Sequence, residues 1–150
     1  MSGLYSSTGR KSSSPGRDAQ ALEAKKLAIE RARRLMDEAS RLVGSDDDRK
    51  RMTKVVGKVC RAVALSLKYG SAPTDEREYR DRCITAMIDQ RLIGDERLAG
   101  NDIELADELS SLIKDAVVES MREGLGTTLE FLGYVVIQGE IATPPPDSQE

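Results

Sequence analysis

The sequence predicts an all-α fold, a bundle of four long helices followed by a short fifth helix. Aromatic residues are scarce, with one Phe, four Tyr and no Trp among 150 residues. A core built mainly from Ala, Val, Leu, Ile and Met is typical of packed helices, because aromatic and β-branched residues concentrate in sheets. Apolar residues also recur every three or four positions in several long segments, which indicates amphipathic helices.

The chain is expected to form one domain with a polar segment at each end. Its length is typical of a single domain that buries roughly two-thirds of its unfolded surface. Residues 1–17 are rich in Ser and Gly and carry three positive charges and no negative one, which predicts a disordered basic arm. Ser12 and Ser14 are candidate phosphorylation sites in this arm, and a solvated tail with incidental charge is an equal alternative. Residues 18–139 would form the helical domain, and residues 140–150 an extended, Pro-rich acidic tail.

The first helix is expected from Asp18 to about Val43. Apolar residues repeat every seven positions on one of its faces, and charged residues occupy the opposite face. A helix of about 26 residues would be ~39 Å long, which is long for a small domain, so we expect it to pack along a partner chain. The predicted interface residues on this helix are Leu22, Ile29, Met36 and Val43.

Three further helices are indicated by capping residues that precede amphipathic segments. Ser45 lies before three aspartates and predicts the start of a second helix, because a hydroxyl cap and negative charge both stabilise a helix N-terminus. Thr74 is expected to cap a third helix that ends near Ile93. Asn101 is expected to cap a fourth helix, whose apolar face is the most regular in the chain.

The segment 127–138 favours a short fifth helix over a strand that pairs between subunits. Thr127 and Glu130 have the spacing of a capping box, and Gly139 has the position of a C-terminal glycine. Against this, Tyr-Val-Val-Ile has strand propensity, and Gly133 weakens a helix by about 1 kcal/mol relative to Ala. Because four helices would already form a complete unit, we expect the apolar residues of this segment at an oligomer interface, and completion of the domain's own core is the alternative. These interface residues are Phe131, Leu132 and Val135.

Charge is divided between the two halves of the chain. Residues 1–71 carry sixteen Lys or Arg against eight Asp or Glu, a net charge of +8. Residues 72–150 carry seven against eighteen, a net charge of −11. The basic half suits a polyanion such as RNA, DNA or an acidic membrane. Alternatively, the basic and acidic halves face each other, within a subunit or head to tail between subunits.

The second helix, together with the arm, supplies the candidate face for a polyanion. Few aromatic residues accompany its charges, so we expect contacts to the phosphate backbone rather than base stacking or sequence-specific recognition. A solvated charged face is the alternative of equal weight. The candidate nucleic-acid contacts are Arg10, Lys11, Arg17, Arg49, Lys50, Arg51, Lys54, Lys58 and Arg61.

Several functional classes find no support in the sequence. The chain has no His, which excludes nucleophile–His pairs and His-based zinc sites, and we predict no enzyme, no cofactor and no metal site. Cys60 and Cys83 lack C-x-x-C spacing and are expected to be buried free thiols in a reducing compartment, cytoplasmic or nuclear. No apolar run approaches 18 residues and none opens the chain, so neither a membrane span nor a signal peptide is expected.

The leading hypothesis is a non-catalytic helical protein that self-associates as a dimer or larger oligomer and binds nucleic acid without sequence specificity. Small viral nucleocapsid-associated, matrix or RNA-sequestering proteins are built on this plan, and such a protein could be packaged in a particle. The alternative is a protein–protein adaptor or assembly factor that binds no nucleic acid.

Overall fold

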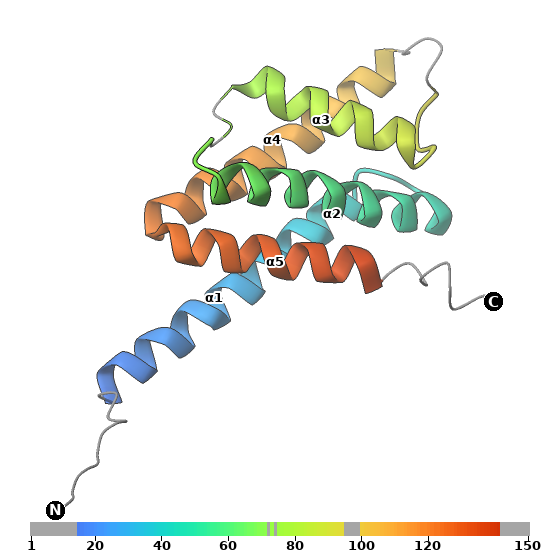
Figure 1. The fold of residues 1–150 in the computed structure, drawn as a ribbon. Helices are drawn as coiled ribbons and strands as arrows, with labels where there is room; N and C mark the ends of the chain where they lie inside the picture. Colours follow the sequence, from blue (N-terminus) through green and yellow to red (C-terminus); the bar gives the residue numbers. More distant parts are fainter. Residues whose placement is uncertain (1–14, 72, 74, 95–99, 142–150) are drawn as a thin grey trace, which may run out of the picture.

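The computed structural model describes residues 15–71, 73, 75–94 and 100–141, and within these ranges the regular elements are all helices (Figure 1). They are α1 (Pro15–Ser40), α2 (Asp46–Lys68), α3 (Glu76–Asp89), α4 (Gly100–Glu123) and α5 (Leu125–Ile141). The all-helical prediction is confirmed, and the last segment is a helix rather than a strand. Residues 1–14 of the predicted arm and residues 142–150 of the predicted tail lie outside the described residues.

The first helix begins and ends earlier than the sequence predicted. α1 starts at Pro15, so Arg17 belongs to a helix and not to the arm. Proline is favoured at the first helical position because its fixed φ suits the helix and its missing N–H would have no partner there. α1 ends at Ser40, and the N–H groups of Leu42 and Val43 bond to carbonyls three residues back, which tightens the final turn.

The predicted start of α2 is confirmed, whereas the third helix differs at both ends. The Ser45 hydroxyl accepts a hydrogen bond from the Asp48 N–H at 3.1 Å. For α3, Asp75 is the cap, because its carboxylate accepts a bond from the Arg77 N–H at 3.0 Å. Thr74, predicted as that cap, lies outside the described residues.

α3 ends at Asp89, four residues before the predicted end, because the chain takes a left-handed backbone conformation two residues later. Arg91 has a φ of 61°, a conformation that most residues avoid. Its N–H bonds to the Ile88 carbonyl at 3.0 Å, and the Leu92 N–H bonds to the Met87 carbonyl at 2.8 Å. These are the two bonds of a Schellman motif, with arginine in the position that glycine usually holds.

The last two helices also begin before their predicted caps. α4 starts at Gly100, so Asn101 lies in its first turn. α5 starts at Leu125, directly after Gly124, which has a φ of 136° and lets the chain reverse. Thr127 and Glu130 therefore lie inside α5 and do not form a capping box.

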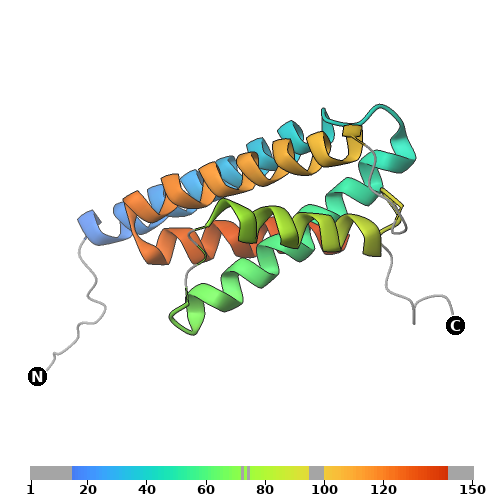
Figure 2. The same cartoon turned by 90° about the horizontal axis from the view of Figure 1, so that it is seen from above.

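The helices form two layers, which Figure 2 shows from above: α1 and α4 lie in one layer, and α2, α3 and α5 in the other. α5 packs against α1, α2 and α4. Phe131, Leu132 and Val135 have no exposed surface because these three helices cover them. The expectation that four helices form a complete unit without α5 is therefore wrong, and in this conformation these side chains present no surface to a second chain.

The predicted interface on α1 divides into a buried part and an exposed part. Met36 is buried in the core, and Ile29 and Val43 are half-buried. Leu22 is 52% exposed, because the N-terminal part of α1 extends beyond the other helices (Figure 1). The apolar residues that repeat every seven positions therefore mainly pack α1 onto the core of the same chain.

Candidate nucleic-acid interface

One face of α2 carries a row of basic side chains, which we call the α2 stripe. It consists of Lys50, Lys54, Lys58, Arg61 and Lys68. Spacings of three, four and seven residues place these side chains along one side of a helix. The opposite face, which includes Met52 and Val63, is buried in the core. At 1.5 Å per residue the stripe is ~27 Å long.

The charges of the α2 stripe are only partly neutralised within the chain. Among the described residues, the Lys50 and Lys54 ammonium groups form no ion pair. Lys58 Nζ lies 2.5 Å from Asp89 Oδ2 of α3, and this hydrogen bond and the lysine's charge lower the pKa of Asp89. Among the described residues, Lys50, Lys54 and Lys68 are therefore the side chains of the stripe that form no ion pair.

Two of the predicted contacts differ from the stripe because carboxylates on the same helix pair with them. Arg49 Nη1 lies 2.9 Å from Asp46 Oδ1, and Arg51 Nη1 lies 2.9 Å from Asp48 Oδ1. The aspartates that start the helix thus offset the arginines that follow them three residues later. The prediction counted these arginines as available because it considered residue type and not pairing.

Of the other predicted contacts, two are exposed and two lie outside the described residues. Arg17 and Arg61 are exposed, and each has an interaction partner. Arg10 and Lys11 lie outside the described residues. The predicted contacts omit Lys68, although its seven-residue spacing from Arg61 could have placed it on the same face.

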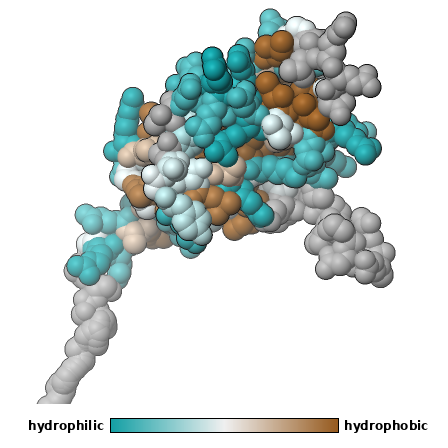
Figure 3. All heavy atoms as spheres, turned by 45° about the horizontal axis from the view of Figure 1, so that its top comes forward, coloured by the Kyte–Doolittle hydropathy of each residue, from teal (hydrophilic) through white to brown (hydrophobic). Residues whose placement is uncertain are grey.

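An exposed leucine and an exposed tyrosine accompany the C-terminal half of the stripe. Leu65 lies between Arg61 and Lys68 on the same face and is 49% exposed. Tyr69 is 76% exposed, and Lys68 Nζ lies 5.9 Å from the centre of its ring. This end of the stripe therefore offers apolar contact and one aromatic ring beside its charges. Figure 3 shows one face of the molecule, on which hydrophobic patches interrupt a largely hydrophilic surface.

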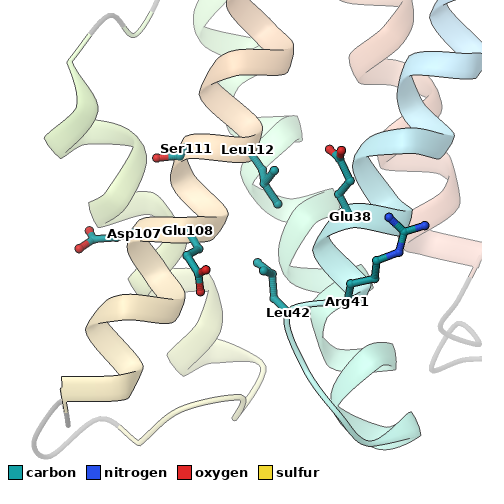
Figure 4. A pocket seen from close by; sticks show the side chains of 7 residues that line it. All are labelled: Glu38, Arg41, Leu42, Asp107, Glu108, Ser111 and Leu112. Atoms are coloured by element: carbon teal, nitrogen blue, oxygen red, sulfur yellow. The ribbon is translucent and has the colours of Figure 1, made fainter.

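A groove lies between α1 and α4, in the other layer of the fold. It has a volume of about 450 Å³ and is lined by Glu38, Arg41, Leu42, Asp107, Glu108, Ser111 and Leu112. Figure 4 shows Leu42 and Leu112 inside the groove, with Glu38 and Glu108 beside them. Asp107 points away toward α3, where its carboxylate lies 3.6 Å from the guanidinium of Arg80.

A buried arginine joins α1 to α4. Arg31 is 4% exposed, and its Nη1 donates to the Ser120 hydroxyl at 2.9 Å. Its Nη2 lies 3.0 Å from the Glu123 carboxylate. Within the described residues, its Nε has no hydrogen-bond partner. Glu123 is 38% exposed, so this ion pair connects the core to the surface and has a structural role.

The two thiols are buried and free, as predicted. Burial raises the pKa of Cys83 to about 12 and also raises the pKa of Cys60, so both thiols are protonated at neutral pH. Protonated, buried thiols are poor nucleophiles. In the part of the chain that the structure describes, no three His, Cys, Asp or Glu side chains are grouped so as to hold a metal ion. None of the described helices is long and apolar enough to cross a membrane.

Comparisons with protein-family models, with curated proteins and with solved structures find no match for this chain.

Proposed function

We propose that this chain is a non-catalytic helical protein that binds nucleic acid through the α2 stripe, without sequence specificity. The observation that carries the proposal is the alignment of five basic side chains on one exposed face of a helix, with Lys50 and Lys54 unpaired among the described residues. Lysine and arginine contacts to phosphate oxygens provide affinity, and they carry no information on base sequence.

The surroundings of the stripe support a single-stranded ligand with phosphate contacts as the main source of affinity. Tyr69, at the C-terminal end, offers one exposed ring on which a base could stack. A single ring gives little discrimination between bases, because every base has a flat face that can stack. We therefore expect the protein to sequester or coat RNA, as small viral nucleocapsid-associated and RNA-sequestering proteins do.

Binding to a labelled single-stranded RNA, measured by fluorescence anisotropy at low salt, tests the proposal. We expect the Lys50→Glu/Lys54→Glu variant to bind at least about tenfold more weakly than wild type, because two phosphate contacts are replaced by repulsion. The matched control is Lys25→Glu/Arg33→Glu, which changes the net charge equally at exposed positions on α1. The proposal is wrong if wild type does not bind at low salt, or if both variants lose the same affinity.

A further inference from the structure

The groove between α1 and α4 combines an apolar floor with unpaired acidic side chains. Leu42 and Leu112 are half-buried at its floor and pack against the core. Glu38 and Glu108 stand beside them, and neither carboxylate forms an ion pair with any described residue. Arg41 is the one cation among the residues that line this groove. Carboxylates on an apolar surface suit a ligand with an apolar centre and positive charge on both sides.

The C-terminal half of the α2 stripe has this complementary character. Leu65 is half-exposed, with Arg61 one turn before it and Lys68 one turn after it. A leucine between two basic residues would place its side chain on Leu42 and Leu112 and its neighbours beside Glu38 and Glu108. Complementary charge at the rim of an apolar contact fixes register and excludes other partners.

One chain does not bring these two surfaces together. The groove is lined only by residues of α1 and α4, whereas the stripe belongs to α2 in the other layer (Figure 2). The groove and the stripe therefore belong to different layers of the same molecule. Two different patches of one chain that fit each other produce a head-to-tail contact between copies.

We propose that the α1–α4 groove binds the α2 stripe of a second copy of this chain, with Leu65 as the apolar anchor. A single groove–stripe contact between two copies leaves one groove and one stripe unoccupied, so further copies can add until the assembly closes into a ring. This inference uses the surface of the proposed function, but it requires no nucleic acid.

Analytical ultracentrifugation at low salt, without nucleic acid, tests the inference. We expect the average mass of wild type to rise past that of a dimer as the concentration increases. Two variants should each remain monomeric: Glu38→Lys/Glu108→Lys, which alters the groove, and Leu65→Ser, which removes the anchor. An equimolar mixture of the two should form a dimer and nothing larger, because only one intact groove and one intact stripe can meet.

The control variant is Glu104→Lys/Glu130→Lys, which makes the same charge change at exposed positions outside the groove and should associate like wild type. The inference is overturned if wild type is monomeric, if the groove variant associates like wild type, or if the mixture remains monomeric. Its failure is distinguishable from that of the proposed function. Leu65→Ser keeps every basic side chain of the stripe, so this variant should still bind RNA.

Discussion

Two glycines set the closest approach between α2 and α5, and an alanine at one of them should force the helices apart. A Cβ atom added at Gly139 would lie 2.9 Å from the Gly57 Cα and 3.0 Å from the Thr53 carbonyl oxygen. Both obstacles are backbone atoms, so no change of side-chain rotamer relieves the clash. Gly133 lies in the same helix, and an added Cβ there has no atom within 4 Å.

Comparison of Gly139→Ala with Gly133→Ala separates the steric cost of the added methyl group from the change in helix propensity. Replacing glycine by alanine within a helix stabilises it by roughly 0.5–1 kcal/mol, and this gain is common to both positions. Extra atoms forced into a well-packed contact cost about 1–3 kcal/mol. We therefore expect Gly133→Ala to raise the free energy of unfolding, and Gly139→Ala to lie about 1–3 kcal/mol below it.

Urea unfolding followed by far-UV circular dichroism measures this difference directly. The midpoints should separate while the slopes stay equal, because neither substitution changes the surface that unfolding exposes. If Gly139→Ala stabilises the protein as much as Gly133→Ala, the two helices do not approach this closely in solution. The packing of α5 against α2 would then need revision.

Three further predictions follow from the burial of Phe131, of Arg31 and of the two cysteines. Phe131→Ala should lower the free energy of unfolding by about 3–5 kcal/mol in urea titrations, because the ring is fully buried; a loss below 1 kcal/mol would contradict its place in the core. Arg31→Ala should cost about 2–3 kcal/mol and the neighbouring, exposed Arg33→Ala less than about 0.5 kcal/mol, whereas equal effects would contradict the buried pair. A thiol reagent at pH 8 should modify Cys60 and Cys83 only after unfolding. Rapid labelling of the native protein would contradict the burial of both thiols. The free energy of unfolding should also fall as pH rises above about 8.5, because the thiols of the unfolded chain lose their protons at a lower pH than the buried thiols of the folded chain.

The start of α2 could be predicted from local residues, whereas the other predicted helix starts were not confirmed. Ser45 could be recognised as a cap because its hydroxyl precedes three acidic residues and an amphipathic segment. Gly139 could not be interpreted correctly in the same way. Glycine serves both helix ends and close helix contacts, and only the position of Gly57 in space distinguishes the two. The central position of α5 likewise depends on long-range packing and not on its own residues.

The basic face of α2 could be predicted from the sequence, but the ion pairs of its side chains could not. The regular spacing of Lys50, Lys54 and Arg61 indicated a basic face from sequence alone. The pairing of Lys58 with Asp89 depends on how α3 packs beside α2, which no local pattern reveals. The groove was missed for the same reason, because Glu38 and Glu108 are brought together only when α1 packs beside α4.

The salt dependence of RNA binding tests the central claim most directly. The five side chains of the stripe set a limit of about −3.5 on the slope of log affinity against log salt concentration for a single strand, and the slope is shallower to the extent that Lys58 and Arg61 keep their partners in the chain. Lys50→Gln/Lys54→Gln removes two contacts and should make this slope shallower by about 1.4. Binding with these two slopes supports the α2 stripe as the nucleic-acid interface. An absence of binding at low salt, or an unchanged slope in the variant, would contradict it.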